Sequence, residues 1–546
     1  MPARSFPPAC VSIPMGRLPL LMPALLVASR RHTAACVGRG APDPRRCPSR
    51  PGNRSVFVRG LTEDAVLRAA IAYPMHPAWM PVETQGMSRM PRQTIAELLG
   101  RIGGSGLAAI RRRVVAGSGR NRDVGGQSNL IASPGSSVLS VIDCGTGLIK
   151  AVVVEPEHRG DDLSNPGQVR VLGVGVAPMP VTSATDVDPG ELLTSVERAL
   201  REAEDVAGTI PRRAMLAVPS AQTVVALGEG TVIRPSPSAP ITRDELAEAM
   251  SLARSAALAK SREYMREDRG DVSDLRVVSA ALFSIMVDTQ SVTEAVGLTG
   301  AKVTVSLAVA ATEMAVYRNL RGLAERLDLE LVGVVAVPAA LGSAVRTNVP
   351  PSGAVVIDIG AGSTTIARIG QGGTELSLSV PIGTNALEDH LVAESGLTSS
   401  QSRETLNRYV SGDLGKISRS ANRDHVQRVA TFFASVWRDA VEVRLAELAR
   451  ERPLPPLVWL CGGGARLPDL RGVLTGPAWR SEYFDQPPVV SVLGTEDLVD
   501  LCGEPERLGQ LHGSVIAPSL ALGIAAIQAI APTDDVSSLV SRMESS

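Results

Sequence analysis

The chain has 546 residues, of which 44% are hydrophobic and 3% aromatic, so it is too long for one hydrophobic core and apolar enough for two α/β lobes. Its formal net charge of −1 conceals an uneven distribution, because residues 1–137 hold 19 Arg and six acidic residues, about +13, while the rest carries about −14. The six cysteines show no C-x-x-C or Cys/His ligand spacing, so the sequence indicates neither a structural zinc site nor a disulfide framework, and this fits a reducing cytoplasm.

Residues 1–137 are rich in Pro, Gly and Ser and show no sustained hydrophobic period, which predicts a largely disordered extension. Their apolar stretch LPLLMPALLVA has about eleven residues, too few to cross a bilayer, which needs roughly 20. A signal peptide can have an apolar core of that length, but we expect no export. An alternative is that translation starts later, at Met87 or Met90, and that the upstream text belongs to an incorrect gene model.

A second stretch of the extension, TIAELLGRIGGSGLAAIRRRVV, places apolar residues beside Arg101 and the three arginines at 111–113. A basic amphipathic helix of this composition would contact a membrane surface. The GGSG interruption weakens such a helix, so a disordered linker is the alternative reading of the same residues.

The next segment, VLSVIDCGTGLIKAVVVE, predicts a strand at Val138–Ile142, a reversal at Gly145, Thr146 and Gly147, and a second strand at Ala151–Glu155. Glycine allows the positive φ of such a turn and brings backbone N–H groups close to an oxyanion. The Thr146 hydroxyl adds a further donor. The segment therefore predicts a phosphate-binding hairpin.

Two charged residues flank this turn. Asp143 ends the first strand, where a carboxylate suits a magnesium ion held through water. Lys150 directly precedes the second strand and is the first of four lysines in a chain with 51 arginines. Its compact ammonium is suited to neutralise the β- and γ-phosphates of a nucleotide.

The following elements complete a sheet and add an insertion at 221–301, which has its own alternating apolar pattern. In the sheet we expect a strand at Val169–Ala177, an amphipathic helix over 189–208 and a strand over 213–219. In the insertion we expect a strand pair over 223–235, a helix from Thr242 to about Lys260 and strands over 275–288.

A second hairpin of the same design, VVIDIGAGSTTIARI, starts at Val355 and has Asp358 at the end of its first strand. Its turn offers backbone donors and hydroxyl groups at Gly360, Gly362, Ser363 and Thr364. Two such hairpins that face each other would clamp a triphosphate, and Asp143 and Asp358 would point at the same gap and hold Mg²⁺ through water.

The rest of the second lobe predicts a helical subdomain over about 376–456. Its helix DHVQRVATFFASVWRDAVEVRLAEL carries apolar residues at a 3–4 spacing, which indicates a buried stripe. The segment VWLCGGGARLPDL then places Gly462, Gly463 and Gly464 between a strand and a helix, where backbone can lie flat against a nucleotide.

In this order the two hairpins and the triple-glycine loop resemble the phosphate-1, phosphate-2 and adenosine motifs of the actin/Hsp70/sugar-kinase superfamily. Within it, the chain is most similar to the bacterial cell-division family FtsA. The resemblance covers about 138–530 and rests on three further stretches: VTEAVGLTGAKVTVSLAVAATEMAVYRNLRGLAERLDLELVGVVAVPAALGSAV from Val292, SVPIGTNALEDHL from Ser379 and APSLALGIAAI from Ala517.

The resemblance implies a two-lobed, actin-like (ribonuclease H-like) α/β ATPase fold that binds ATP and Mg²⁺. Lobe 1 would span 138–350 with an FtsA-type strand-helix-strand-strand (SHS2) insertion, lobe 2 would span 351–530, and 531–546 would be a short flexible tail. By the same resemblance Glu404 would meet the adenosine ribose, although the Lys usual three residues later is Asn407 here.

Two departures from the family bear on hydrolysis. Thr365 stands where relatives often carry an acid near the γ-phosphate, and Val337 with Pro338 replaces the usual E-P. Attack by water needs a group that orients it and accepts its proton, and neither position offers an ionisable side chain. We therefore expect ATP binding with slow or absent hydrolysis, and we assign no catalytic residue.

The resemblance implies a cytoplasmic scaffold, self-assembling as a polymer or dimer, that binds the tail of FtsZ and other division proteins at the inner membrane of the division site. The basic residues of SRETLNRYVSGDLGKISRSANRDHVQR would receive an acidic tail, or they form an ordinary solvated helix face. FtsA-like chains end in a basic amphipathic helix, whereas this one ends APTDDVSSLVSRMESS, which leaves membrane contact open.

Two other functions remain open, and no nucleic-acid partner is expected. A PilM-like pilus or secretion assembly factor would share the core and the insertion. A sugar kinase would need an Asp base beside a sugar pocket. We do not expect an Hsp70 chaperone, which needs a peptide-binding domain where only about 16 residues follow Ile530.

Overall fold

The computed structural model describes residues 130–131, 137–157, 168–180, 189–270, 272, 274–413, 423–476, 479, 481–498, 501–502 and 512–530. Most of the extension at 1–137, with its arginine-rich stretch at 94–115, lies outside the described residues, as does the tail at 531–546. Within the extension, β1 (Leu130–Ile131) pairs in parallel with β5 (Thr209–Ile210), so this short piece is a strand and not disordered.

The first lobe is built on a six-stranded sheet whose order is β11-β6-β2-β3-β4-β17. Its strands are β2 (Leu139–Cys144), β3 (Leu148–Glu157), β4 (Gln168–Pro178), β6 (Arg213–Val218), β11 (Glu330–Ala336) and β17 (Leu501–Cys502). β3 runs antiparallel to β2 and β4, whereas β6 is parallel to β2 and β11 to β6. The strands at the centre are Val-, Ile- and Leu-rich because both faces of the sheet are buried.

The second lobe repeats this arrangement within a nine-stranded sheet. The corresponding strands are β12 (Ala354–Ile359), β13 (Thr364–Gly370), β14 (Gly373–Val380), β15 (Leu457–Cys461) and β16 (Val489–Val492). Here β13 is antiparallel to β12 and β14, while β15 is parallel to β12 and β16 to β15. If the five shared strands of each lobe are numbered in chain order, both sheets have the spatial order 3-2-1-4-5: β4-β3-β2-β6-β11 in lobe 1 and β14-β13-β12-β15-β16 in lobe 2. This duplicated arrangement confirms the actin-like fold that the sequence predicted.

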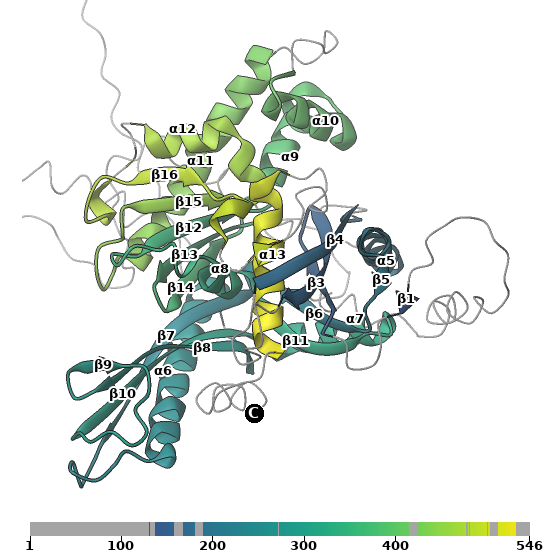
Figure 1. Ribbon diagram of the computed structural model, residues 1–546. Coiled ribbons are helices and arrows are strands. Elements are labelled where there is room, and N and C mark those ends of the chain that lie inside the picture. Colours follow the sequence, from purple (N-terminus) through teal and green to yellow (C-terminus); the bar gives the residue numbers. More distant parts are fainter. Residues whose placement is uncertain are drawn as a thin grey trace, which may run out of the picture. The chain divides into compact units, whose positions relative to one another are not determined.

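The insertion in lobe 1 forms a strand-helix-strand-strand unit that extends the second sheet (Figure 1). It consists of β7 (Thr223–Ile233), α6 (Arg243–Arg269), β8 (Leu275–Val287), the short β9 (Gln290–Val292) and β10 (Lys302–Glu313). β7 joins the lobe 2 sheet through two residue pairs with β14, Ala226 with Leu376 and Val225 with Ser377. Since β10 pairs along the whole of β7, the unit continues past residue 301, where the sequence placed its end.

Two features of the insertion differ from the sequence prediction. The expected strand pair over 223–235 is one continuous strand, because Gly228 and Gly230 do not turn the chain but let α6 approach it. A Cβ at Gly230 would lie 2.0 Å from the carbonyl oxygen of Ala249. The helix expected over Thr242 to about Lys260 has Thr242 as its N-cap, in a reciprocal capping box with Glu245, and continues past Lys260 to Arg269.

The helical part of lobe 2 begins after β14, so the strand at 373–380 belongs to the sheet and not to the helical subdomain predicted from 376. It contains α9 (Thr384–Ser395), α10 (Ser399–Val410), α11 (Arg423–Leu448) and, after β15, α12 (Pro468–Thr475). α11 buries the predicted apolar stripe, with Trp437 fully enclosed.

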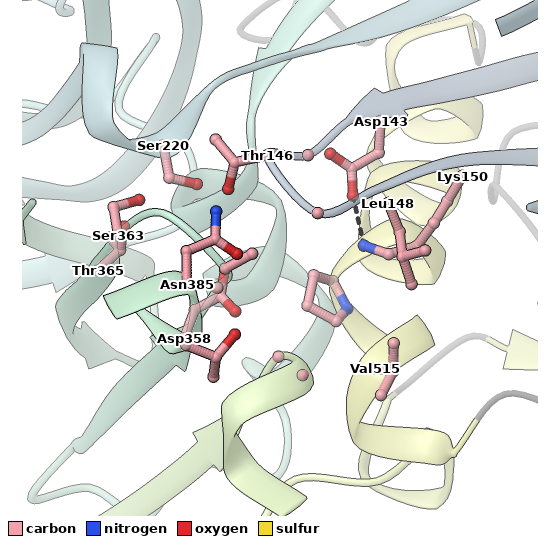
Figure 2. A pocket seen from close by; sticks show the side chains of 18 of the residues that line it. Asp143, Thr146, Leu148, Lys150, Ser220, Asp358, Ser363, Thr365, Asn385 and Val515 are labelled. Atoms are coloured by element: carbon pink, nitrogen blue, oxygen red, sulfur yellow. Dashed lines mark hydrogen bonds and ion pairs between the residues drawn. The ribbon is translucent and has the colours of Figure 1, made fainter. Parts of the chain in front are cut away.

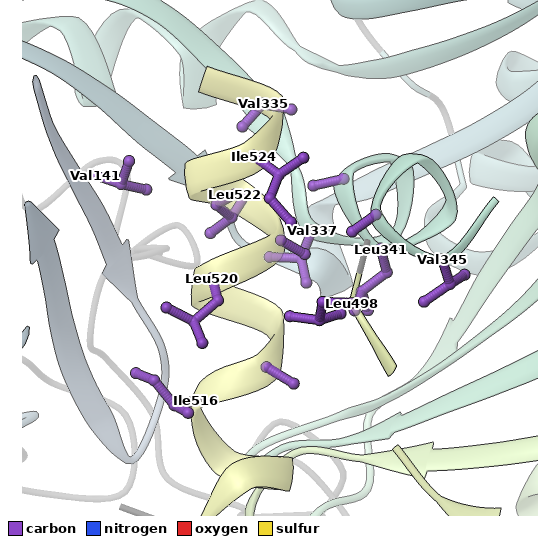
Figure 3. Close-up of a cluster of buried hydrophobic side chains, with 14 of the residues drawn as sticks. Val141, Val335, Val337, Leu341, Val345, Leu498, Ile516, Leu520, Leu522 and Ile524 are labelled. Carbon is purple, nitrogen blue, oxygen red and sulfur yellow. The ribbon is translucent and has the colours of Figure 1, made fainter. Parts of the chain in front are cut away.

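A helix from the end of the chain joins the two lobes. α13 (Gly513–Ile530) packs on α8 (Val337–Val345) and on strands of both sheets, within one apolar cluster (Figure 3). The cluster draws Val141 and Val152 from lobe 1 and Val356 from lobe 2. In the described part of the chain, no helix is long and apolar enough to span a membrane.

Candidate functional site

A cavity of about 610 Å³ lies between the lobes, within the size range of small-molecule sites. The two hairpin turns, the triple-glycine loop, α10 and the first turns of α13 line it. Ten of the residues predicted from sequence are in the lining: Asp143, Gly145, Thr146, Gly147, Lys150, Asp358, Gly360, Ser363, Gly462 and Gly463.

The first hairpin brings opposite charges into contact. Asp143 and Lys150 are paired residues on β2 and β3, and the Lys150 Nζ donates to Asp143 Oδ2 at 2.8 Å. The Ser519 hydroxyl of α13 donates to the same oxygen at 2.9 Å. Figure 2 shows the second oxygen of Asp143 turned towards Thr146. One carboxylate oxygen thus anchors the hairpin and the other faces the cavity.

The second hairpin supplies Asp358, at the end of β12. Burial raises the pKa of Asp358 to about 6, and the nearby Asp143 adds to the rise while Lys150 opposes it. The Cys461 thiol, which burial holds protonated by raising its pKa, forms a hydrogen bond with this carboxylate. Burial would lower the pKa of Lys150, but Asp143 and Asp358 raise it, so the ammonium keeps its charge between them.

The raised pKa of Asp358 predicts a pH-dependent stability in nucleotide-free protein. A carboxyl whose folded pKa lies above its unfolded value stabilises the fold below the unfolded pKa, near 4, and that contribution is lost as pH rises through about 6. Asp358→Asn removes this pH dependence. The difference in unfolding free energy between the variant and the native chain should therefore shift by roughly 3 kcal/mol in favour of the variant when the pH is raised from 4 to 7.

Urea denaturation at both pH values measures this difference. Asp244→Asn, at an exposed carboxylate in the first turn of α6, is the control for the removal of a negative charge. A difference between Asp358→Asn and the native chain that is the same at pH 4 and pH 7 would contradict the environment described for Asp358.

The two hairpin turns touch each other across the cavity. The Gly362 N–H donates to Thr146 Oγ1 at 2.7 Å, and a Cβ at Gly147 would lie 2.8 Å from the Cβ of Ala361. Glycine is needed here because the opposite turn occupies the space of a side chain. The segments predicted to face each other from sequence, more than 200 residues apart, are in direct contact.

The triple-glycine loop closes against the second hairpin. Gly462 has a φ of +81°, and a Cβ there would lie 2.4 Å from Asp358 Oδ1. Gly463 has open space around it, which leaves room for a flat ligand against the backbone. Gly464 is buried against Ile359 and does not line the cavity.

The cavity extends to α10, at the end where the resemblance places the adenosine. Helical periodicity turns one face of α10 to the cavity, with Arg403, Leu406, Asn407 and Val410. Glu404 stands on the neighbouring face, where its side chain is 60% exposed and pairs with Arg408, so it is not in the lining. Glu404, which the resemblance placed at the ribose, thus lies outside the lining, whereas Asn407, at the position of the usual Lys, is part of it.

Two predicted turn residues also lie outside the lining. Thr364 is fully buried, where its hydroxyl donates to the Ile382 carbonyl at 2.8 Å and accepts from the Trp437 indole at 2.9 Å. Gly362 is held behind Thr146. From this hairpin, the hydroxyl-bearing residues in the lining are Ser363 and Thr365.

Among the lining residues that the sequence did not indicate as site residues are Ser220, Asn385, Arg466 and His512. Figure 2 shows Asn385 on the same side as Asp358, Ser363 and Thr365. Asn385 lies two residues after the P-I-G turn, and its position just after this turn could have indicated it as a site residue from the sequence. His512 directly precedes α13, and its Nδ1 accepts a hydrogen bond from the Ser514 N–H of that helix at 3.2 Å.

The donor set suits a magnesium ion bound together with a phosphate chain. Asp143 and Asp358 line one cavity with the Thr146 and Ser363 hydroxyls, and the close fit of Gly462 on Asp358 admits no side chain beside that carboxylate. No group of three or more His, Cys, Asp or Glu that could hold a metal occurs among the described residues. Mg²⁺ bound through one or two carboxylates, waters and phosphate oxygens needs no such group.

The positions linked to hydrolysis are also at the cavity. Thr365 is buried, with its hydroxyl 2.9 Å from that of Ser379, and Val337 is in the lining. Neither can accept a proton from attacking water at neutral pH.

Comparisons with known proteins agree with the resemblance read from the residues. No protein-family model matches the chain. It is 26% identical over 231 residues to the cell division protein FtsA of Enterococcus faecalis, which covers 42% of this chain and 48% of that protein. It is 23% identical over 265 residues to FtsA of Neisseria meningitidis serogroup B, which covers 46% and 56%. The chain thus spans about half the length of the curated relatives it matches.

Among solved structures, the PilM–PilN type IV pilus biogenesis complex contains a chain with 17% sequence identity and a TM-score of 0.48, over 71% of this chain and 97% of that chain. The four FtsA matches, at 23–26% identity, confirm that the chain is FtsA-like in sequence.

Proposed function

We propose that this chain is an ATP-binding, actin-like cell-division protein of the FtsA type. It binds ATP with Mg²⁺ between its lobes, assembles with copies of itself, and links the FtsZ ring to other division proteins on the cytoplasmic side of the membrane. The sequence similarity to four proteins named FtsA supports the division role.

The observation that carries the nucleotide part is the convergence of three glycine-rich segments on one cavity. Residues from β2–β3, from β12–β13 and from the loop after β15 meet there, although they are separated by over 300 residues. Backbone N–H groups at such turns, beside Lys150, provide the donors and the positive charge that a triphosphate requires. Asp143 and Asp358 would hold the ion, which neutralises phosphate charge when bound.

Two measurements test the proposal. Isothermal titration of the purified chain with ATP and Mg²⁺ should give saturable binding that weakens when Mg²⁺ is omitted. A fluorescent fusion at native expression should collect at mid-cell and disperse when FtsZ is depleted. Absence of nucleotide binding would refute the first part. Localisation to pilus assembly sites instead of mid-cell would refute the second.

We expect turnover of bound ATP to be slow or absent, because Thr365 and Val337 offer no proton acceptor. A phosphate-release assay at saturating ATP should remain near the rate without protein. Turnover well above that background, and abolished by Asp358→Ala, would contradict this expectation.

A further inference from the structure

Helix α13, which joins the two lobes, contains a proline, Pro518, at the point where the helix reaches the proposed nucleotide cavity. Pro518 is the sixth residue of α13 and has no N–H to donate. In a regular helix that N–H would bond to the carbonyl four residues earlier, which belongs to Ser514. Pro518 therefore leaves the Ser514 carbonyl without its helical donor.

That carbonyl is used by the triple-glycine loop. The Gly462 N–H donates to the Ser514 oxygen at 2.8 Å. Gly462 is the glycine with the positive φ and the close contact to Asp358, so this bond sets the position of the loop at the point where it meets the second hairpin. A buried N–H without such a partner would cost free energy comparable to a lost hydrogen bond.

The next residue of the helix contacts the other lobe. Ser519 is almost fully buried and donates to Asp143 Oδ2 at 2.9 Å. Adjacent turns of α13 thus bond one group from each half of the cavity, Gly462 from lobe 2 and Asp143 from lobe 1. Pro518 itself, with Val515 and His512, lines the cavity.

We propose that Pro518 is a positioning residue for nucleotide binding: by withholding one helical donor it leaves the Ser514 carbonyl to fix the triple-glycine loop, while Ser519 fixes Asp143. This inference rests on the proposed nucleotide site. It assigns to α13 the task of setting the distance between the loop and the first hairpin, with a polar bond on each side.

The test is Pro518→Ala in the full chain. Alanine restores an N–H that competes for the Ser514 carbonyl, so the hydrogen bond from the Gly462 amide to that oxygen should weaken. Removal of a proline from a helix interior favours the helix, so the thermal midpoint without nucleotide should be unchanged or higher. Affinity for ATP with Mg²⁺ should fall by about tenfold, the effect of one lost hydrogen bond near the upper end of the usual range.

Hydrogen exchange separates this inference from the proposed function, because it needs no nucleotide. In nucleotide-free Pro518→Ala the Gly462 amide should exchange at least about tenfold faster than in the native chain. The control is Pro468→Ala, at the first residue of α12, where proline displaces no helical hydrogen bond. It should change neither affinity nor the exchange of Gly462.

Native affinity and unchanged Gly462 exchange in Pro518→Ala would overturn the proposal. A joint loss of stability and affinity would also overturn it, since that result indicates a purely structural role. If the native chain binds no nucleotide while Gly462 exchange still rises in the variant, the proposed function fails and the role of Pro518 in fixing the loop stands.

Discussion

Lys150→Met should lower the affinity for ATP with Mg²⁺ by about thirtyfold or more, the effect expected when a charge-assisted bond worth about 2 kcal/mol is lost. Lys150 lies between Asp143 and Asp358, and its side chain is 12% exposed. Without it, two carboxylates face the phosphate chain with no ammonium to offset them. The pKa of Asp358, which Lys150 lowers, should rise further.

The same variant should lose about 3 kcal/mol of unfolding free energy at pH 7, because removal of one partner from a buried pair leaves the other charge uncompensated. Titration calorimetry and urea denaturation measure the two effects. Lys302→Met, at an exposed lysine of β10 far from the cavity in the fold, is the matched control and should change neither. Native affinity in Lys150→Met would exclude a role for this residue at the phosphates.

Gly230→Val should destabilise the inserted subdomain by about 4 kcal/mol or more, among the largest effects of a single substitution. The side chain would start 2.0 Å from the Ala249 carbonyl oxygen and 2.4 Å from the Ala253 nitrogen. Both are backbone atoms of α6, which no rotamer change can move. The helix would have to move away from the sheet, exposing the apolar cluster that α6 forms with β8 and β10.

The control for this substitution is Gly322→Ala in α7 (Met314–Arg326), where nothing lies within 4 Å of the added Cβ. That variant should gain about 0.5–1 kcal/mol, because alanine restricts the unfolded chain. Thermal unfolding of both variants, with limited proteolysis at α6, distinguishes the outcomes. Gly230→Val with native stability would mean that α6 does not pack on β7 as closely as described.

The two glycine hairpins were predictable because their sequence pattern is local. Each is a buried apolar strand with an Asp near its end, followed by a glycine turn, so the sequence pattern alone singled out Asp143 and Asp358, and both line the cavity. The duplicate sheets follow from the same segments, since each hairpin supplies the first two strands of a lobe.

Residues whose role depends on which side of a helix is turned to the cavity were not predictable in this way. Glu404 and Asn407 are on one helix, and which of them meets the cavity depends on how α10 is rotated against its neighbours. Tertiary contacts fix that rotation, among them the hydrogen bond from the Tyr409 hydroxyl to Asp469 of α12, 2.8 Å long, and the ion pair of Arg403 with Glu388 of α9. No local pattern of α10 indicates it.

The glycines of β7 show the same limit in a strand. A G-x-G sequence inside an apolar run is typical of a turn, and it is also what a strand needs where a helix crosses it closely. Gly228 and Gly230 belong to the second case because the backbone of α6 at Ala249, Ala253 and Ala257 lies directly against them. The distinction requires knowledge of both partners, and they lie some twenty residues apart.

The seam between β7 and β14 has a mechanical consequence. The inserted unit emerges from lobe 1, yet its backbone is bonded to the sheet of lobe 2, and Lys260 and Asp268 near the end of α6 form ion pairs with Glu451 and Arg444 around the end of α11. If the lobes move apart to admit or release a ligand, the insert should move together with lobe 2. Its connections to lobe 1, near residues 220 and 313, should then act as hinges.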